Sequence, residues 1–284
     1  MKLFKAAELL RLELQGRRQN GVSIGFVPTM GALHFGHLSL IQRAREENDA
    51  VVCCIFVNPK QFNEQADLVK YPRPLEKDVQ MLEKEGVDYV FHPEVSEIYG
   101  SEYLDDDIDL NNLDHILEGQ QRPGHFQGVA KVVKRLFEIV QPTRAYFGQK
   151  DFQQTVVVRL LIKKFFPETH LVVCPIIRES HGLAMSSRNE RLSEQNRLHA
   201  AFIYKSLLKL KERLNYKPIQ EALASTSKYL NSVENAELEY LAVVDGNTMK
   251  EVDSLDASNL IVVVVVVKYC DVRLLDNIII RDES

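Results

Sequence analysis

The fold is decided by residues 22–37, which read VSIGFVPTMGALHFGH. The apolar run Val22–Val27 predicts a strand that breaks at Pro28. Beyond two glycines, apolar side chains recur at helical spacing and predict a helix over His37–Glu47. A glycine-bearing turn from strand to helix directs backbone N–H groups and the positive end of the helix dipole to one place. Such a turn favours the binding of phosphate.

The same turn carries two histidines, His34 and His37. Side chains three residues apart on a helical turn lie on the same side, so both imidazoles are expected to face a bound phosphate. A single histidine at a helix start is more often a cap or a packing residue. The pair beside Gly31 and Gly36 instead favours chemistry on a nucleotide phosphate. Zinc is a weaker interpretation, because a zinc site needs three or four ligands and the spacing supplies no others.

Composition describes an ordinary globular protein. The chain has 284 residues, 45% of them hydrophobic and 26% charged, which allows a large core and two domains. A net charge of −5 argues against a general nucleic-acid binder, which would normally present a basic face. The N-terminus leads into a helical pattern with no signal-peptide core, and the longest apolar run, Leu260–Val267, is far shorter than a bilayer span. That run predicts a covered central strand.

The four cysteines are Cys53, Cys54, Cys174 and Cys270, and they form no C-x-x-C pair. Three of them lie in or beside apolar runs that predict strands. Buried, reduced thiols in a cytoplasmic protein are the expected interpretation.

Strands and helices alternate through the first half of the chain, which predicts a parallel sheet with helices on both faces. The pattern predicts further strands at Ala50–Val57, Val87–Phe91, Arg144–Phe147 and His170–Cys174, and helices at Leu75–Glu85, Gln127–Ile139 and Phe152–Phe165. An irregular stretch reaches Pro74, and an acidic loop surrounds residues 105–107. Ligands of such sheets bind at the carboxyl ends of the strands.

The second half predicts a smaller α+β domain, because helices come first and strands follow. Its expected elements are a long helix over Ser193–Leu214, a second helix over 218–230, and strands at Glu237–Val244, Leu260–Val267 and Val272–Ile280. The predicted division is 1–176 and 177–284.

Two polar runs leave the ends of predicted strands. In residues 57–62, VNPKQF, the amide of Gln61 can donate and accept, which suits a hydroxylated, carboxylate-bearing small molecule, although Asn-Pro also opens ordinary turns. In residues 147–154, FGQKDFQQ, Lys150 can neutralise a phosphate, and Asp151 can accept from ribose hydroxyls or cap the helix. Gln154 follows one turn later on the same side.

Two more runs are candidates. Residues 182–189, GLAMSSRN, place two serines and Arg188 on a loop of small residues, which predicts a phosphate clamp. The serines are equally suited to cap the next helix. Residues 122–125, RPGH, are either a site or a loop turn.

Taken together, the runs closely resemble those of the pantothenate synthetase (pantoate–β-alanine ligase) family, in family order and over nearly the whole chain. The H-x-G-H spacing alone is shared with other adenylyl-transferring enzymes, whereas the set is specific. Lesser matches are Tyr71-Pro72-Arg73, residues 124–130 (GHFQGVA) and the tail 273–277 (RLLDN).

The resemblance implies a Rossmann-like nucleotide-binding domain, a smaller C-terminal lid domain and a homodimer. It implies catalytic roles for His37, as the acid, and for His34 and Lys150. Gln61 and Gln154 would bind pantoate, and Gln61 would also meet β-alanine. The implied ATP-binding residues are Met30, Gly31, Ala32, Leu33, His34, Phe35, Gly36, His37, Gly148, Gln149, Lys150, Asp151, Ile177, Met185, Ser186, Ser187 and Arg188.

Three positions depart from the family pattern. His181 stands where an aspartate is usual, and Pro74 replaces a threonine. A carboxylate pair that holds Mg²⁺ in some relatives is half matched by Lys77 and Asp78. No metal ligand is therefore assigned, and Mg²⁺ is expected to arrive with ATP.

The expected reaction is ATP-dependent condensation of pantoate with β-alanine through a pantoyl adenylate, with release of AMP and pyrophosphate. The partners are then these small molecules, with neither nucleic acid nor membrane. The alternatives are another adenylyl- or cytidylyltransferase of the same superfamily, a fragment of an aminoacyl-tRNA synthetase, and a silent nucleotide-binding regulator.

Overall fold

The computed structural model describes residues 1–100 and 106–283, so residue 105 of the predicted acidic loop lies outside the described part. The chain divides into two compact units. The first comprises Met1–Gly148 and Val157–Cys174, and the second comprises Gln149–Val156 and Pro175–Ser284. This grouping differs from the expected division in placing residues 149–156 with the second unit. Hydrogen bonds from Asn277 to the carbonyls of residues 149 and 150 hold the start of this segment to the second unit.

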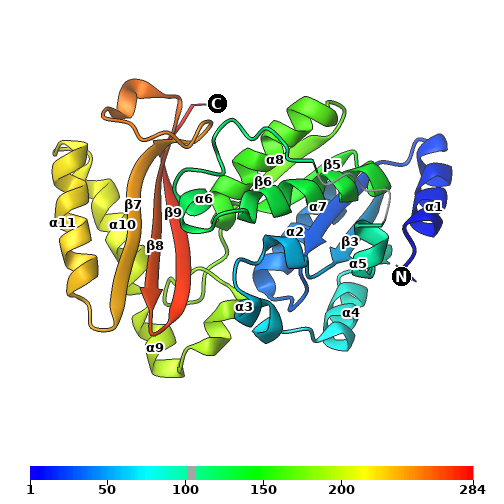
Figure 1. The fold of residues 1–284 in the computed structure, drawn as a ribbon, viewed down its shortest axis with the longest axis horizontal. Helices are drawn as coiled ribbons and strands as arrows, with labels where there is room; N and C mark the ends of the chain where they lie inside the picture. Colours follow the sequence, from blue (N-terminus) through cyan, green and yellow to red (C-terminus); the bar gives the residue numbers. More distant parts are fainter. Residues whose placement is uncertain (101–105, 284) are drawn as a thin grey trace. The chain divides into compact units, whose positions relative to one another are not determined.

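A six-stranded sheet forms the centre of the first unit, with the order β1-β4-β3-β2-β5-β6 and parallel pairing throughout (Figure 1). Its strands are β1 Lys2–Phe4, β2 Ile24–Thr29, β3 Ala50–Ile55, β4 Tyr89–Phe91, β5 Arg144–Gly148 and β6 His170–Cys174. The direction of strand addition reverses between β2 and β5. In open parallel sheets, ligands bind at such a switch point, at the carboxyl ends of the strands.

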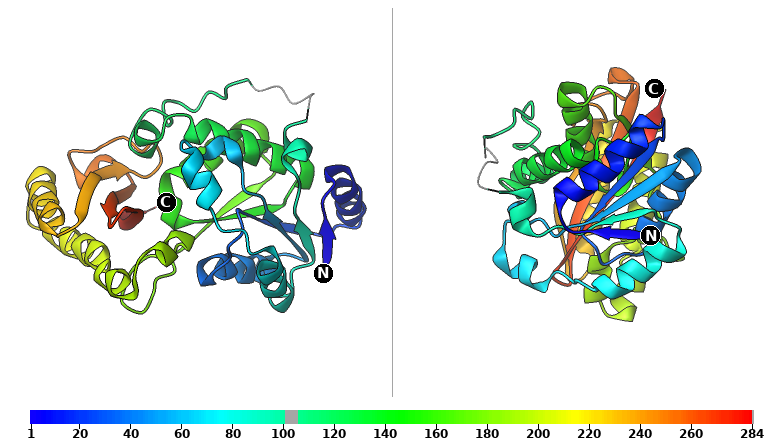
Figure 2. Two further views of the ribbon diagram at one scale, coloured as in Figure 1. Left: turned by 60° about the horizontal axis from the view of Figure 1, so that its bottom comes forward. Right: turned by 90° about the vertical axis from the view of Figure 1, so that its right-hand side faces the viewer.

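Helices cover both faces of this sheet, as the alternating pattern predicts (Figure 2). Phe26 and Val27 of β2 point to opposite faces because side chains alternate along a strand. Phe26 packs edge-on against Phe137 of α7, His125–Val140, with ring centroids 6.1 Å apart. Val27 belongs to a buried cluster with Ile41 of α2, Phe35–Glu47.

The remaining helices of this unit are α1 Ala7–Gln19, α3 Gln65–Lys70, α4 Leu75–Lys84, α5 Val95–Ile98 and α6 Glu118–Gln121, together with the short 3₁₀ helix η1, Pro59–Gln61. Helix α8, Phe152–Phe165, begins in the second unit and ends in the first, and it has the predicted bounds.

The predicted break at Pro28 is wrong, because β2 continues to Thr29, which pairs with Ile55 of β3. Even-numbered residues of β2 direct their backbone N–H and C=O groups toward β5, since Thr143 N–H donates to Ile24 O. Odd-numbered residues direct theirs toward β3, since Phe56 N–H donates to Thr29 O. The β5 ladder has ended at the Phe26–Ala145 pair, so the missing N–H of Pro28 disrupts no ladder bond.

Two short elements had no signal in the sequence. Strand β1 has only three residues, too few to show an alternating pattern, and it pairs with β4. Helix α3 lies within the stretch that was expected to be irregular.

The second unit contains an antiparallel sheet in the order β7-β8-β9, with helices packed against it. Its elements are α9 Glu194–His199, α10 Phe202–Arg213, α11 Ile219–Ser232, β7 Ala236–Asp245, β8 Leu260–Tyr269 and β9 Val272–Asp282. Strand β8 is central, and all of its residues from 260 to 267 are buried. The predicted covered central strand is confirmed.

The single long helix predicted over 193–214 is wrong, because it is two helices separated at Ala200 and Ala201. Ala201 N–H donates to Leu198 O and Ile203 N–H donates to Ala200 O, so these bonds span three residues in place of four. The tighter turn interrupts the helix, and alanine gives no sequence signal for it.

The fold class is confirmed: a parallel α/β sheet with helices on both faces, and a smaller α+β unit. Within the described ranges 1–100 and 106–283, no helix is long and apolar enough to cross a membrane.

Candidate active site

His34 and His37 lie side by side at the start of α2, with ring centroids 4.1 Å apart. His34 is the N-cap of the helix, and its Nδ1 accepts from the N–H of Gly36 at 3.1 Å. The N–H of His34 donates to Nδ1 of His37 at 3.3 Å. An imidazole that accepts at Nδ1 carries its proton on Nε2 when neutral. Both rings are therefore set to donate a hydrogen bond from Nε2.

The backbone N–H groups of this turn are already engaged within the protein. Ala32 and Leu33 donate to the two oxygens of Asp78, each at 2.8 Å. Gly31 donates to Oγ1 of Thr29 at 3.1 Å. These three N–H groups are therefore used within the protein, and the imidazoles of His34 and His37 are further donors that the turn can offer to a phosphate.

Asp78 of α4 holds this turn and is only 1% exposed. Burial raises the pKa of its carboxyl group, and the N–H groups of Leu33 and Ala32 oppose that shift. Gly31 has a φ of +77°, and a Cβ there would lie 2.9 Å from Asp78 Oδ2. Glycine is thus required by both conformation and space. The sequence indicates Asp78 only as half of a metal-binding pair and carries no signal for this role.

Gln61 is fixed by contacts at both polar atoms of its side chain, Nε2 and Oε1. Its Nε2 donates to the sulfur of Met30 at 2.9 Å, and its Oε1 accepts from Asn58 Nδ2 at 3.1 Å. Asn58 is 1% exposed and also donates to the carbonyl of Gly128 in α7 at 3.0 Å. The structure therefore brings the predicted substrate residue Gln61 next to Met30, a predicted ATP residue.

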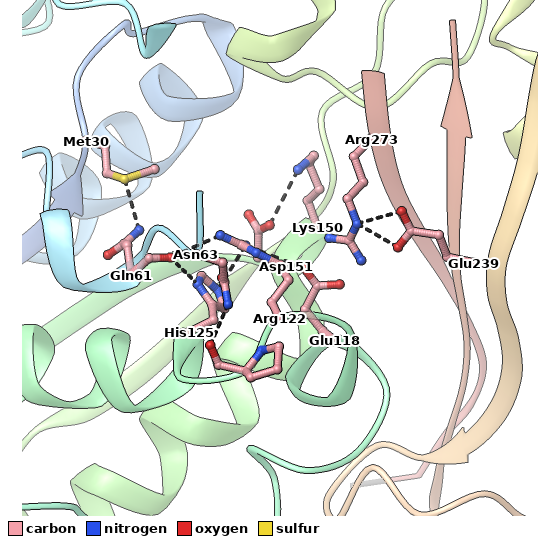
Figure 3. Close-up of polar contacts among 11 residues, drawn as sticks. Met30, Gln61, Asn63, Glu118, Arg122, His125, Lys150, Asp151, Glu239 and Arg273 are labelled. Atoms are coloured by element: carbon pink, nitrogen blue, oxygen red, sulfur yellow. Dashed lines mark hydrogen bonds and ion pairs between the residues drawn. The ribbon is translucent and has the colours of Figure 1, made fainter. Parts of the chain in front are cut away.

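The backbone carbonyl of Gln61 is held by the 122–125 run (Figure 3). His125 Nδ1–H donates to it at 2.8 Å, and Arg122 Nη2 donates at 3.0 Å. Arg122 also lies 3.5 Å from the carboxylate of Glu118. The sequence left two interpretations open for this run, a site or a loop turn. In the structure the run anchors Gln61.

A close backbone approach completes this anchor. A Cβ on Gly128 would lie 2.2 Å from the carbonyl oxygen of Lys60, so only glycine lets α7 approach the turn at residues 59–61.

A cavity of about 290 Å³ adjoins the histidine turn. Its wall includes Met30, Gly31 and Asp78, and it continues past His92 and Arg73. A cavity of this size, apolar with a few ionisable groups, suits a small molecule.

Lys150 lies in the short 3₁₀ helix η2, Gln149–Asp151, of the second unit. Its Nζ is 3.5 Å from Asp151 Oδ1. Asn277 of β9 donates to the carbonyls of Gln149 and Lys150 at 2.9 and 3.0 Å. Gln154 follows on α8 and is half-buried. The 273–277 tail matches the family pattern, but its sequence carries no signal that it holds this turn.

Ile177 and the loop from Met185 to Arg188 are brought together within the second unit. Met185 N–H donates to the carbonyl of Ile177 at 2.9 Å, and Arg178 pairs with Ala184 across the same hairpin. Ser186 accepts from the N–H of Arg188 at 3.2 Å and caps the 3₁₀ helix η3, Ser187–Arg191. Of the two interpretations of the serines, the structure shows capping for Ser186.

The chain is clearly similar to known proteins of one family. The Pantoate-beta-alanine ligase family model matches residues 2–279. Pantothenate synthetase of Christiangramia forsetii is 42% identical over 283 residues, covering 99% of this chain and 100% of the relative. The crystal structure of pantothenate synthetase from Thermus thermophilus has a TM-score of 0.91 at 40% identity, and the match covers 99% of this chain and 100% of that one.

A third match is a crystal structure of pantoate–β-alanine ligase from Francisella tularensis, in complex with β,γ-ATP and β-alanine. It has a TM-score of 0.79 at 34% identity and covers 98% of this chain and 97% of that one. Each of these likenesses extends over both units. The chain belongs to the pantoate–β-alanine ligase family.

Proposed function

We propose that this chain joins pantoate to β-alanine by activating the carboxylate of pantoate with ATP. The observation that carries the proposal is the paired His34 and His37, whose Nδ1 atoms accept backbone N–H groups. The family match favours this ligase over another adenylyl- or cytidylyltransferase. The ATP and β-alanine complex of the Francisella relative supports both small molecules as substrates.

In the first half-reaction, a carboxylate oxygen of pantoate attacks the α-phosphorus of ATP. The bond from that phosphorus to the bridging oxygen breaks, and pyrophosphate leaves. We assign the Nε2–H donors of His34 and His37 to the phosphate oxygens on which charge develops, with His37 as the acid. Lys150 and Arg188 are the cations proposed to bind the phosphates.

Binding of ATP is proposed to involve the whole predicted set of residues. These are 30–37, 148–151, Ile177 and 185–188. The helix dipole of α2 adds a positive potential at the histidine pair.

In the second half-reaction, the amine of β-alanine attacks the carbonyl carbon of the pantoyl adenylate. The amide bond forms, AMP leaves with the bridging oxygen, and the ammonium proton is lost. Gln61 and Gln154 are the proposed ligands of pantoate. Gln61 is the better supported of the two, because its backbone and its amide are both held.

Magnesium is proposed to enter with ATP. In the described part of the chain, no group of three His, Cys, Asp or Glu side chains could hold a metal ion, and the oxygens of Asp78 already accept two N–H groups. The residues fit a Mg²⁺ ion that keeps phosphate and water ligands, as this ion commonly does. Such an ion supplies charge neutralisation at the phosphates.

We also propose a cytoplasmic homodimer. The four cysteines are free thiols, which suits a reducing compartment. The dimer rests on the family resemblance, and light scattering of the purified protein tests it.

The test of the function is AMP release from ATP and Mg²⁺ with pantoate, β-alanine, both or neither. AMP should accumulate in quantity only when pantoate and β-alanine are both present. His37→Ala and Lys150→Ala should each lower kcat/KM by about 100-fold or more, since each removes a donor to developing charge. ATP binding without any turnover would support the silent regulator, and unchanged rates in both variants would contradict the assigned roles.

A further inference from the structure

Asn277 of β9 occupies an unusual position for a buried amide. It is 2% exposed, and every polar atom of its side chain contacts the Lys150 turn. Its Nδ2 donates to the carbonyls of Gln149 and Lys150 at 2.9 and 3.0 Å, and its Oδ1 accepts from Gln149 Nε2 at 2.9 Å. One side chain therefore fixes two consecutive peptide units of this turn.

Asn277 is itself held by a buried ion pair. Asp276 accepts from the guanidinium of Arg178 with both oxygens, at 2.6 and 2.8 Å, and Asp276 Oδ1 also accepts from the N–H of Asn277 at 2.8 Å. The guanidinium lies 3.6 Å from the centre of the Tyr204 ring. Burial raises the pKa of Asp276, and the Arg178 contact opposes this shift.

The same arginine reaches the hairpin that carries other predicted ATP residues. Arg178 follows Ile177 directly and donates to the carbonyl of Gly182 at 3.1 Å. The Arg178–Asp276 pair therefore ties the Lys150 turn to the 177–185 hairpin, all within the second unit. Because a buried, fully bonded network has one low-energy arrangement, it fixes the geometry of both segments.

Lysine needs such a fixed backbone more than most phosphate ligands do. Its ammonium group is a point charge on a flexible four-carbon chain, so a fixed Cα–Cβ bond narrows the positions that the ammonium group can reach. We propose that Asn277, supported by the Arg178–Asp276 pair, is a positioning residue that sets Lys150 for phosphate binding. This inference rests on the role of Lys150 in the proposed function.

A double-mutant cycle on the full chain tests the inference. Asn277→Ala, Lys150→Ala and the double variant are compared with wild type by kcat and by KM for each substrate. Asn277→Ala should lower kcat/KM for ATP by about 100-fold, because a misplacement near 1 Å has that effect. The KM for β-alanine should stay within about twofold. In the Lys150→Ala background the same change should lower kcat/KM for ATP by no more than about threefold.

Two further variants separate positioning from packing. Asn277→Asp keeps the shape but replaces the donor with an acceptor that faces two carbonyls, and it should be as impaired as Asn277→Ala. Thr226→Ala is the matched control, because Thr226 is 1% exposed, bonds to Ala222 and Arg213, and lies in the same unit. It should lower the Tm without changing the KM for ATP. If Asn277→Ala is unfolded at the assay temperature, Asn277→Ser replaces it in the same measurements.

The outcomes are distinct. If Asn277→Ala lowers kcat/KM for ATP equally in both backgrounds, Asn277 does not act through Lys150 and the inference is overturned, while the proposed function stands. If Lys150→Ala turns over like wild type, the role of Lys150 fails first, and the inference fails with it.

Discussion

Two turns that leave neighbouring strands of one sheet are held in opposite ways. The turn after β2 presents its N–H groups to a buried carboxylate, Asp78. The turn after β5 presents its carbonyls to a buried amide, Asn277. One anchor accepts and carries a titratable charge, and the other donates and is neutral.

The difference explains which groups remain for a ligand. In the first turn the anchor occupies the N–H groups of Ala32 and Leu33, and we assign the donors for a ligand to His34 and His37. In the second turn the anchor occupies carbonyls, and a cationic side chain, Lys150, supplies the charge. Both turns thus have a fixed backbone and present side chains to a ligand.

The largest effect is expected when the carboxylate anchor is removed. Asp78→Asn places an NH₂ group against a backbone N–H and leaves a buried donor without an acceptor. An unsatisfied buried donor costs about 2 kcal/mol, and a displaced histidine pair should lower kcat by about 100-fold. Urea unfolding and AMP release measure the two effects. Asp49→Asn is the control, because Asp49 also accepts a backbone N–H but lies on the surface; an equal loss there would contradict the anchor role.

The glycines of the two turns should respond differently to alanine. In Gly31→Ala, the alanine is held at a positive φ that it disfavours, and its Cβ would lie 2.9 Å from Asp78 Oδ2. We therefore expect a loss of about 2 kcal/mol in unfolding free energy. A Cβ on Gly148 would meet nothing within 4 Å, so Gly148→Ala should stay within about 0.5 kcal/mol of wild type. Equal destabilisation of the two variants would remove the contrast between the turns.

The smallest effect is a pH dependence that only the carboxylate anchor produces. Burial raises the pKa of Asp78 in the folded protein, so the folded state binds the proton more tightly than the unfolded chain does. Its contribution to stability is then present below the unfolded value of about 4 and is lost as pH rises through the raised pKa. Asn does not titrate, so the stability difference between wild type and Asp78→Asn should narrow as pH rises. A difference that widens would contradict this sign.

Much of this architecture could be predicted from the sequence, because its signals are local. The bounds of α8 and β6 follow from apolar periodicity alone, and the valine run predicts the central strand β8. The runs around His34, Lys150 and Arg188 are likewise contiguous in the chain, so the residue types within them indicate phosphate chemistry.

The anchors could not be predicted, because they join residues far apart in the chain. Asp78 lies 46 residues from Ala32, and Asn277 lies 127 residues from Lys150. A side chain that binds a distant backbone leaves no periodic pattern at either end. The strand through Pro28 was missed for a related reason, since only the end of the β5 ladder makes that proline acceptable.

The central claim is that pantoate attacks the α-phosphorus of ATP through its carboxylate. The most direct measurement uses pantoate labelled with ¹⁸O in that carboxylate, followed by mass spectrometry of the products. The account predicts one ¹⁸O atom in each AMP released and none in pyrophosphate. Label in pyrophosphate or inorganic phosphate, with AMP unlabelled, would contradict it.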